Sequence, residues 1–496
     1  FLQEVFREKN RKTVLTGSIL AIVICGGLLA WMYSFKNIKP DHKVTAGVIG
    51  FLAVYLILFA VGTSVKKMYR IFPAAVLLVL ICELFVLDYP SLWHRESPTR
   101  NQVATEYYND GTKEAVAMLK EQDDSVYRIE KSYTSASEND GMSQGYNGLS
   151  VYMSTNPASL VAYHKMYGPE TLSGNFVDFN MDDYIRSSLL GTKYLITGTG
   201  YHAPQKIYTS VGEAGGRSVF ENQYALPFGY LYDKEWNQEE VKEMSGLDKT
   251  LASLSGFYYT DAEETSSYQK ADLPEQTDLS LLDYADTATD CTMEKGSEGI
   301  TVSNLGADPN VVFPGVASCF ADNDKLYGLS LTVDAPDETE MAVYYQTEGD
   351  EGFSAEKVYT FKVTEDNRTW EHLVPGGITE LRVDVSSPVE SAVINNFELK
   401  SCDITESGYT ALKESGVDEV TFSDSTYQAQ VTNDASENKM LCVPLFYQKG
   451  WTAQIDGEDA GVYNINEGMC GVEVPSGTHE LSLIHISEPT RHAQIS

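Results

Sequence analysis

The chain has 496 residues, and its 71 acidic residues outnumber 36 basic ones to give a formal net charge of −35. The imbalance lies after residue 90, because the first 90 residues hold 10 basic and 5 acidic residues and the remainder holds 26 and 66. A surface this acidic repels phosphate backbones, which excludes nucleic acid as a partner and favours a solvated domain.

Three apolar stretches precede the acidic part, at Val14–Tyr33, Val44–Val65 and Ile71–Leu87. At a rise of about 1.5 Å per helical residue, each has about the length that a bilayer core of about 30 Å requires. None contains Lys or Arg, and Glu83 is their only carboxylate. We therefore expect three transmembrane helices in the lipid bilayer, with residues 1–90 forming the C-terminal part of a polytopic transmembrane domain.

Basic residues predict the orientation of these stretches. Four lie in Phe1–Lys12, and Lys66, Lys67 and Arg70 lie in the loop between the second and third stretches. The positive-inside rule places both segments in the cytoplasm, although three lysines in residues 34–43 weaken the asymmetry. Three crossings would leave the large acidic part outside, so we expect a multi-pass protein of the cell membrane with an extracytoplasmic domain.

Residues 91–240 alternate between helical and strand-like patterns, which predicts an α/β domain. A Gly- and Asn-rich polar stretch follows the first expected strand and is typical of a loop. The expected elements in chain order are a helix at Thr112–Lys120, a strand at Val126–Lys131, the loop at Ser135–Thr155, helices at about Pro157–Met166 and at Asn180–Leu190, and a strand at Lys193–Thr197.

From residue 290 the apolar period changes to two. Leu329, Leu331 and Val333 alternate with polar residues, and similar short runs are separated by turn-forming segments. This pattern predicts a jelly-roll-like β-sandwich. The expected divisions are a connecting segment at 241–289, the sandwich at 290–402, a small C-terminal β domain at 403–483, and a tail at 484–496 that resembles translated sequencing adaptor and is expected to be non-native.

Five sequence segments carry a resemblance to a known family. They are YRIEK (127–131), the stretch from NDG to GYNGLSVYMST (139–155), LLGTKYLI (189–196), FENQYALPFGY (220–230) and QKGWTAQIDGE (448–458). In this order they resemble the bacterial YfhO membrane-protein family, and GVEVPSGTHELSL (471–483) resembles its last β unit. The resemblance covers the chain up to Leu483.

The resemblance implies a protein similar to the GT-C glycosyltransferases. Such a protein would take sugar from a polyprenyl-phosphate carrier, with no other cofactor evident, and transfer it to a cell-wall polymer such as lipoteichoic acid. The catalytic carboxylate of that architecture lies on the first exterior loop, which this sequence does not contain. We therefore expect an inactive C-terminal portion, and a non-enzymatic polymer-binding or transport accessory is the alternative.

Glu83 is the candidate catalytic residue in this sequence. A carboxylate in an apolar helix is costly unless it is paired or faces a cavity. It is either part of the carrier and sugar pocket, as an acid or base or as a metal or hydroxyl contact, or a helix-end residue that reaches interfacial water. If it is functional, we expect it to face the interior of the helical bundle.

Five further residues are candidates for substrate binding. Asn139, Asp140, Tyr146 and Asn147 combine amides and a carboxylate with an aromatic ring, as sugar hydroxyls and CH faces require, but the same residues favour a structural turn. Arg186 could hold a phosphate or pair with Asp182 or Asp183 on its own helix.

No other chemical motif stands out in the sequence. Cysteines with neither CxxC spacing nor histidines at ligand spacing predict no metal site. Trp370, Tyr344 and Tyr345 are possible sugar platforms in the expected sandwich, for which a spacer role is equally open because fold alone does not establish binding.

Overall fold

The computed structural model describes most of the chain. The described residues are 11–32, 42–64, 71–88, 99–136, 139–153, 155–167, 176–177, 184–198, 207–261, 268–322, 325–336, 338–355, 357–365, 367–385, 390–401, 408–423 and 425–485. The chain divides into two compact units, Phe1–Arg100 and Asn101–Ser496.

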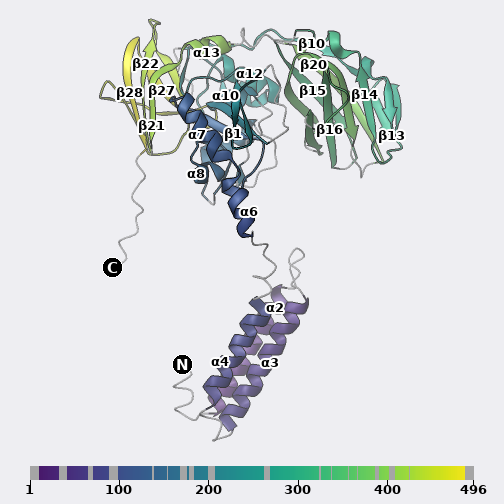
Figure 1. Cartoon of the computed structure of the whole chain (residues 1–496), viewed down its shortest axis with the longest axis vertical. Coiled ribbons are helices and arrows are strands. Elements are labelled where there is room, and N and C mark those ends of the chain that lie inside the picture. Colours follow the sequence, from purple (N-terminus) through teal and green to yellow (C-terminus); the bar gives the residue numbers. More distant parts are fainter. Residues whose placement is uncertain are drawn as a thin grey trace. The chain divides into compact units, whose positions relative to one another are not determined.

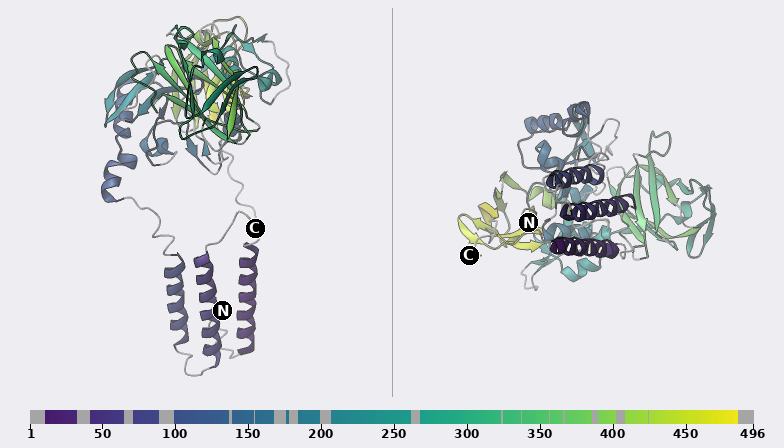
Figure 2. Two further views of the ribbon diagram at one scale, coloured as in Figure 1. Left: turned by 90° about the vertical axis from the view of Figure 1, so that its right-hand side faces the viewer. Right: turned by 90° about the horizontal axis from the view of Figure 1, so that it is seen from below.

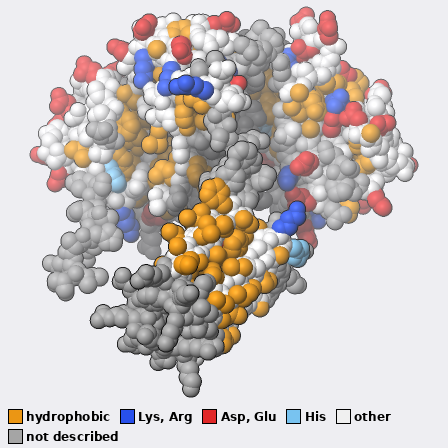
Figure 3. Space-filling view, turned by 60° about the horizontal axis from the view of Figure 1, so that its bottom comes forward, with side chains coloured by type: hydrophobic (Ala, Val, Ile, Leu, Met, Phe, Trp, Pro, Cys, Tyr) orange, Lys and Arg blue, Asp and Glu red, His pale blue; other side chains and the backbone are white. Residues whose placement is uncertain are grey.

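The first unit consists of three neighbouring helices (Figure 2). They are α2 (Arg11–Met32), α3 (His42–Ser64) and α4 (Phe72–Glu83), which continues into the π-helix η2 (Leu84–Asp88). Their described side chains form a largely hydrophobic surface (Figure 3). Such a surface is stable in a lipid environment, because apolar side chains lose no hydrogen bonds there.

The prediction of three transmembrane helices is wrong. Among the described residues, one helix is long and apolar enough to cross a membrane by length and composition, and it covers His42–Val61 with a mean hydropathy of 2.5. The apolar segment at Phe72–Leu87 is shorter, because its α-helical part ends at Glu83. The expected span at Val14–Tyr33 corresponds to helix α2, which ends at Met32 and is not among the candidate spans found in the described residues.

The second unit is built mainly from β-sheets, and its first sheet is mixed. Strand order is β1-β4-β6-β5, with β1 parallel to β4 and the other pairs antiparallel. The strands are β1 (Arg128–Lys131), β4 (Thr192–Thr197), β5 (Tyr208–Ala214) and β6 (Arg217–Asn222). Helix α7 (Thr112–Gln122) buries Ala115, Val116 and Leu119 in the core that covers this sheet.

The N-terminal part of the second unit also contains short elements. They are α6 (Arg100–Thr105), η3 (Tyr107–Asn109), α8 (Asp140–Gln144), β2 (Val151–Tyr152), α9 (Ala158–Tyr167), β3 (Phe176–Val177), α10 (Tyr184–Leu189), β8 (Lys234–Glu235), α11 (Gln238–Glu243), α12 (Gly246–Ser255) and β9 (Gln269–Lys270). Ser245 caps α12 by accepting a hydrogen bond from the Asp248 amide at 3.2 Å, and Leu247, Leu251 and Leu254 are buried on one face.

The central part of the second unit is a β-sandwich, as the period-two pattern predicts (Figure 1). One sheet has the order β12-β13-β20-β15-β18, with β10 on β20, and the other has the order β11-β14-β19-β16-β17. Leu329, Leu331 and Val333 are fully buried between the two sheets, and the rings of Phe313 and Phe397 meet edge to face at 5.0 Å. The core is therefore formed by alternating inward residues of both sheets.

The sandwich elements have the following bounds: β10 (Thr277–Ser280), η4 (Leu282–Tyr284), β11 (Thr287–Thr289), β12 (Thr292–Gly296), β13 (Gly299–Ser303), β14 (Asn310–Pro314), η5 (Val316–Ser318), β15 (Leu326–Asp334), β16 (Thr339–Thr347), β17 (Val358–Val363), β18 (Thr369–Pro375), β19 (Ile378–Val385) and β20 (Ser391–Ser401). The long strands β15 and β20 are neighbours in the first sheet.

Two further sheets share a core near the C-terminal end. Their orders are β21-β22-β28-β24-β25 and β26-β27-β23-β7. The elements are β7 (Tyr230–Tyr232), α13 (Thr410–Glu414), β21 (Val417–Ser423), β22 (Thr426–Asn433), β23 (Lys439–Phe446), β24 (Trp451–Ile455), β25 (Glu458–Ala460), β26 (Tyr463–Ile465), β27 (Met469–Val474) and β28 (Gly477–His485). Because β7 pairs with β23, residues on either side of the large sandwich in sequence complete one sheet.

Candidate functional site

Glu83 lies at the end of α4 and faces helix α3. Its Oε2 atom accepts a hydrogen bond of 2.7 Å from the hydroxyl of Tyr55, which lies near the middle of α3. Both residues are half-buried. The hydrogen bond orients the carboxylate, and its second oxygen has no hydrogen-bond partner among the described residues, so this pair can accept a proton or contact a sugar hydroxyl.

The amides of the Gly- and Asn-rich loop bind the protein backbone. The Asn139 side chain donates to the carbonyl of Tyr152 at 2.8 Å and accepts from the Tyr152 amide at 3.0 Å. Asn147 donates to the carbonyl of Tyr127 at 3.3 Å. These contacts hold β2 and the start of β1 in place, and they support the structural interpretation of both asparagines.

Asp140 is also held by protein groups. Its carboxylate forms an ion pair of 2.8 Å with Lys131, and the two side chains are only 4% and 5% exposed. It also accepts hydrogen bonds from the backbone amides of Ser135 and Ala136. Lys131 further donates to Gln144 at 3.1 Å, and burial lowers the pKa of Lys131 despite its acidic partner.

A second ion pair extends this buried network. Arg217 lies 3.2 Å from Asp110, whose carboxylate also accepts hydrogen bonds from Ser135 and Gln144. The ring of Tyr133 lies 4.0 Å from the Arg217 guanidinium carbon and 4.7 Å from the Lys131 ammonium, so it contacts both cations.

Tyr146 closes the same network from the loop side. Its ring centroid is 5.9 Å from the Lys131 ammonium, and burial raises the pKa of its hydroxyl well above the usual value. Of the four loop candidates, Asp140 and Tyr146 therefore belong to one buried network, whereas Asn139 and Asn147 contact the backbone. Asp110, Lys131 and Arg217 were not expected from the sequence, although Lys131 lies in the family segment YRIEK.

Arg186 lies on α10 and is half-buried. It is not close in sequence to the residues of this network. Its proposed partners Asp182 and Asp183 lie outside the described residues. Within the described ranges, no group of three or more His, Cys, Asp or Glu side chains is arranged to hold a metal ion.

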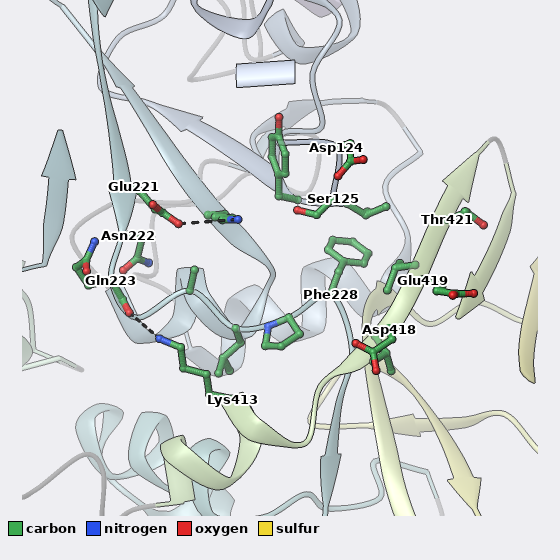
Figure 4. Close-up of a pocket in the computed structure, with 18 residues that line it drawn as sticks. Asp124, Ser125, Glu221, Asn222, Gln223, Phe228, Lys413, Asp418, Glu419 and Thr421 are labelled. Carbon is green, nitrogen blue, oxygen red and sulfur yellow. Dashed lines mark hydrogen bonds and ion pairs between the residues drawn. The ribbon is translucent and has the colours of Figure 1, made fainter. Parts of the chain in front are cut away.

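A separate groove of about 870 Å³ lies between the mixed sheet and strand β21 (Figure 4). Its volume is in the range of about 300–1,000 Å³ that is typical of small-molecule sites. The lining segments are 124–127 before β1, Lys193 on β4, 221–228 at the end of β6, Lys413 on α13 and 417–421 on β21. Nothing in the sequence indicated this groove, because its lining segments are widely separated along the chain.

Acidic groups predominate in the groove. Asp124, Glu221, Asp418 and Glu419 line it together with Lys193 and Lys413. Lys193 is already held 3.8 Å from Glu221 and more closely by a neighbouring carboxylate. The groove is therefore unsuited to an anionic ligand.

That neighbouring carboxylate is Asp123, which fixes one wall of the groove. Lys193 and the hydroxyl of Tyr194 donate to it at 2.6 and 2.7 Å. Burial disfavours its charged form, but the hydrogen bonds from Lys193 and Ser125 outweigh this and hold the pKa of Asp123 well below its usual range. Asp123 is therefore ionised at neutral pH and accepts hydrogen bonds from Lys193 and Tyr194.

Comparison with known proteins identifies relatives. A family model described as "Bacterial membrane protein YfhO" matches residues 1–491. A protein of Bacillus subtilis (strain 168), named "Uncharacterized protein YfhO", is 21% identical over 507 residues, which cover 96% of this chain and 54% of the relative. The chain thus spans about half the length of this curated relative.

Solved structures show only weak likenesses. The C-terminal CBM6 of LamC from Zobellia galactanivorans is 14% identical, with 26% of this chain and 99% of that chain covered at a TM-score of 0.18. Arabinofuranosyltransferase AftD from Mycobacteria is 8% identical, with 47% and 29% covered at a TM-score of 0.15. TM-scores this low carry no argument about function.

Proposed function

The chain belongs to the YfhO family of bacterial membrane proteins, and on that premise we propose that it is the C-terminal portion of a membrane glycosyltransferase. The proposed reaction transfers a sugar from a polyprenyl-phosphate carrier to a cell-wall polymer such as lipoteichoic acid on the outer face of the membrane. The acidic second unit is proposed to lie on that outer side. The match of residues 1–491 to the family model is the observation that carries the proposal.

Glu83 is the proposed participant from this chain. In glycosyl transfer, an acceptor hydroxyl attacks the anomeric carbon, the bond to the carrier phosphate breaks, and a base takes the hydroxyl proton. The Tyr55 hydrogen bond orients Glu83 while leaving one carboxylate oxygen for such a contact. A charge in an apolar helix also costs free energy, so a role in catalysis would explain its presence.

The test is sugar transfer by the full-length protein in membrane vesicles. Glu83→Gln should lower the rate of transfer from a polyprenyl-phosphate sugar by about tenfold or more, within the range expected for loss of a general base. Cys82→Ala, which alters the neighbouring exposed residue on α4, is the matched control and should leave the rate unchanged. Equal amounts of each variant in the membrane would exclude a folding defect, and an unchanged rate for Glu83→Gln would return Glu83 to a structural role.

A non-enzymatic polymer-binding accessory is the second candidate, and the open groove beside β21 favours it. The two candidates differ in one observable. A glycosyltransferase of this architecture requires an acidic residue on the first exterior loop of the complete protein, and substitution of that residue should abolish transfer. An accessory protein would bind polymer and show no transfer with any variant.

A further inference from the structure

We propose that the groove between the mixed sheet and β21 binds a hydroxyl-rich glycan segment that carries no anionic group. The inference depends on the proposed function only for the identity of the polymer that supplies this segment. It concerns the second unit alone, and its residues are distinct from Glu83 and from the buried Lys131–Asp140 network.

The polar groups of the groove are available to a ligand. Within the described chain, the side chains of Asp124, Gln223, Asp418 and Glu419 make no hydrogen bond or ion pair. All four are exposed at the groove. Carboxylates accept hydrogen bonds from sugar hydroxyls and the amide both donates and accepts, so together they match the hydroxyl groups of a sugar.

The floor of the groove is apolar. Figure 4 shows the Phe228 ring between the Glu221–Gln223 side and the Asp418–Thr421 side. Leu226, Pro227 and Val417 also line it. An apolar floor between polar rims suits the alternation of CH faces and hydroxyl edges in a glycan.

The charges of the groove select against anions. Its four carboxylates exceed its two lysines, and both lysines already have acceptors, because Lys413 donates to the Gln223 carbonyl at 3.2 Å and Lys193 pairs with two carboxylates. A phosphate-bearing polymer backbone would meet uncompensated negative charge. The groove therefore favours the sugar part of such a polymer over its phosphate part.

The shape of β21 disfavours a peptide strand as the ligand. β21 is an edge strand, but its register with β22 shifts between Asp418 and Thr421. Glu419 has a φ of +50° at this bulge, in the left-handed region that non-glycine residues rarely adopt. A bulge interrupts the row of backbone groups that an added strand would need and directs side chains into the groove instead.

The experiment measures binding to the full chain in nanodiscs by calorimetry and saturation-transfer NMR. The probes are uncharged tetrasaccharides of glucose, galactose or N-acetylglucosamine, with a glycerol phosphate oligomer as the anionic comparison. We expect at least one tetrasaccharide to bind with a Kd of about 0.1–1 mM, because the groove offers only a small number of solvent-exposed contacts. The glycerol phosphate oligomer should bind more weakly.

Paired variants locate the binding. Asp418→Ala with Glu419→Ala should weaken the best probe by about fivefold or more, because it loses two acceptors. Asp278→Ala with Glu294→Ala removes the same two charges from exposed sandwich strands and should leave the Kd unchanged. Gln223→Ala is an independent variant on the opposite side of the groove and should also weaken binding.

Three results would overturn the inference: no saturable binding of any tetrasaccharide, equal binding by the groove variant and the parent, or tighter binding of glycerol phosphate than of every neutral probe. Sugar transfer is measured separately. If the parent chain bound no tetrasaccharide while sugar transfer was intact, the groove proposal alone would be rejected. Binding without transfer would reject only the proposed enzymatic activity.

Discussion

The buried Lys131–Asp140 ion pair allows a direct test of whether the Gly- and Asn-rich loop is structural. Asp140→Asn keeps the shape of the side chain but leaves the Lys131 ammonium without its anionic partner, in a position where both side chains are at most 5% exposed. Breaking a buried pair in this way typically costs about 3–5 kcal/mol. Lys131 keeps hydrogen bonds to Ser135 and Gln144, so we expect the lower end, about 3 kcal/mol.

A second substitution separates the loss of charge pairing from a general packing defect. Lys131→Met removes the ammonium, and in the double variant the side-chain amide oxygen introduced at position 140 can still accept from a backbone amide. The Asp140→Asn, Lys131→Met double variant should therefore be more stable than Asp140→Asn alone, by about 1–2 kcal/mol. An exposed Asp278→Asn control should change stability by less than about 0.5 kcal/mol.

The assay is hydrogen exchange at increasing urea concentrations, followed in peptides that cover β1 and α8. Exchange in these peptides reports local opening, which a whole-chain melting temperature would average with other parts. If Asp140→Asn left their protection within about 0.5 kcal/mol of the parent, the reasoning from burial would be wrong. Weakened glycan binding without loss of protection would instead restore Asp140 as a ligand contact.

Three other outcomes follow from the structure. The depressed pKa of Asp123 means that its bond with Lys193 stabilises the folded state above about pH 4 and loses this effect as the pH falls further. Asp123→Asn should therefore lower the stability at pH 7. It should also reduce the loss of stability on acidification, and urea midpoints at several pH values measure both effects. Gly299→Ala should destabilise the sandwich by about 2 kcal/mol or more, because its φ is +122° and an added Cβ would clash with a backbone oxygen of β20. The control in the same unfolding assay is Gly352→Ala, where an added Cβ has no atom within 4 Å. Phe397→Ala should cost about 3–5 kcal/mol by urea unfolding, because the ring is fully buried against its neighbour on the facing sheet.

Local pattern was sufficient to predict the sandwich but not the number of membrane crossings. Alternation at Leu329, Leu331 and Val333 corresponds directly to burial, because a strand places every second side chain on the same face. Apolar length is a weaker guide, because it does not show where helical geometry changes. At Phe72–Leu87 the α-helix gives way to a π-helix after Glu83, and this change lies within the apolar run.

The loop candidates illustrate a different limit of sequence reasoning. Asp140 and Tyr146 have the residue types of a sugar site, but whether they are exposed depends on side chains that come from distant segments. Asp110 and Arg217 are 107 residues apart in sequence and meet beside the loop. The sequence could not reveal these partners, because Asp110 lies in the loop before α7 and Arg217 lies on β6, and only the folded chain brings these two segments together.

The groove is a consequence of the way in which the chain returns to the mixed sheet. Strand β7 follows this sheet directly in sequence, yet it completes a sheet with β23, about 200 residues later. Tyr230 and Tyr232 on β7 are buried in the core that both parts share. This pairing brings β21 beside the end of β6. One rim of the groove therefore comes from the segment before the sandwich and the other from the segment after it, so both segments are needed to form the groove. A glycan that contacts both rims would therefore stabilise the folded second unit, since a ligand that binds only the folded state shifts the unfolding equilibrium towards it.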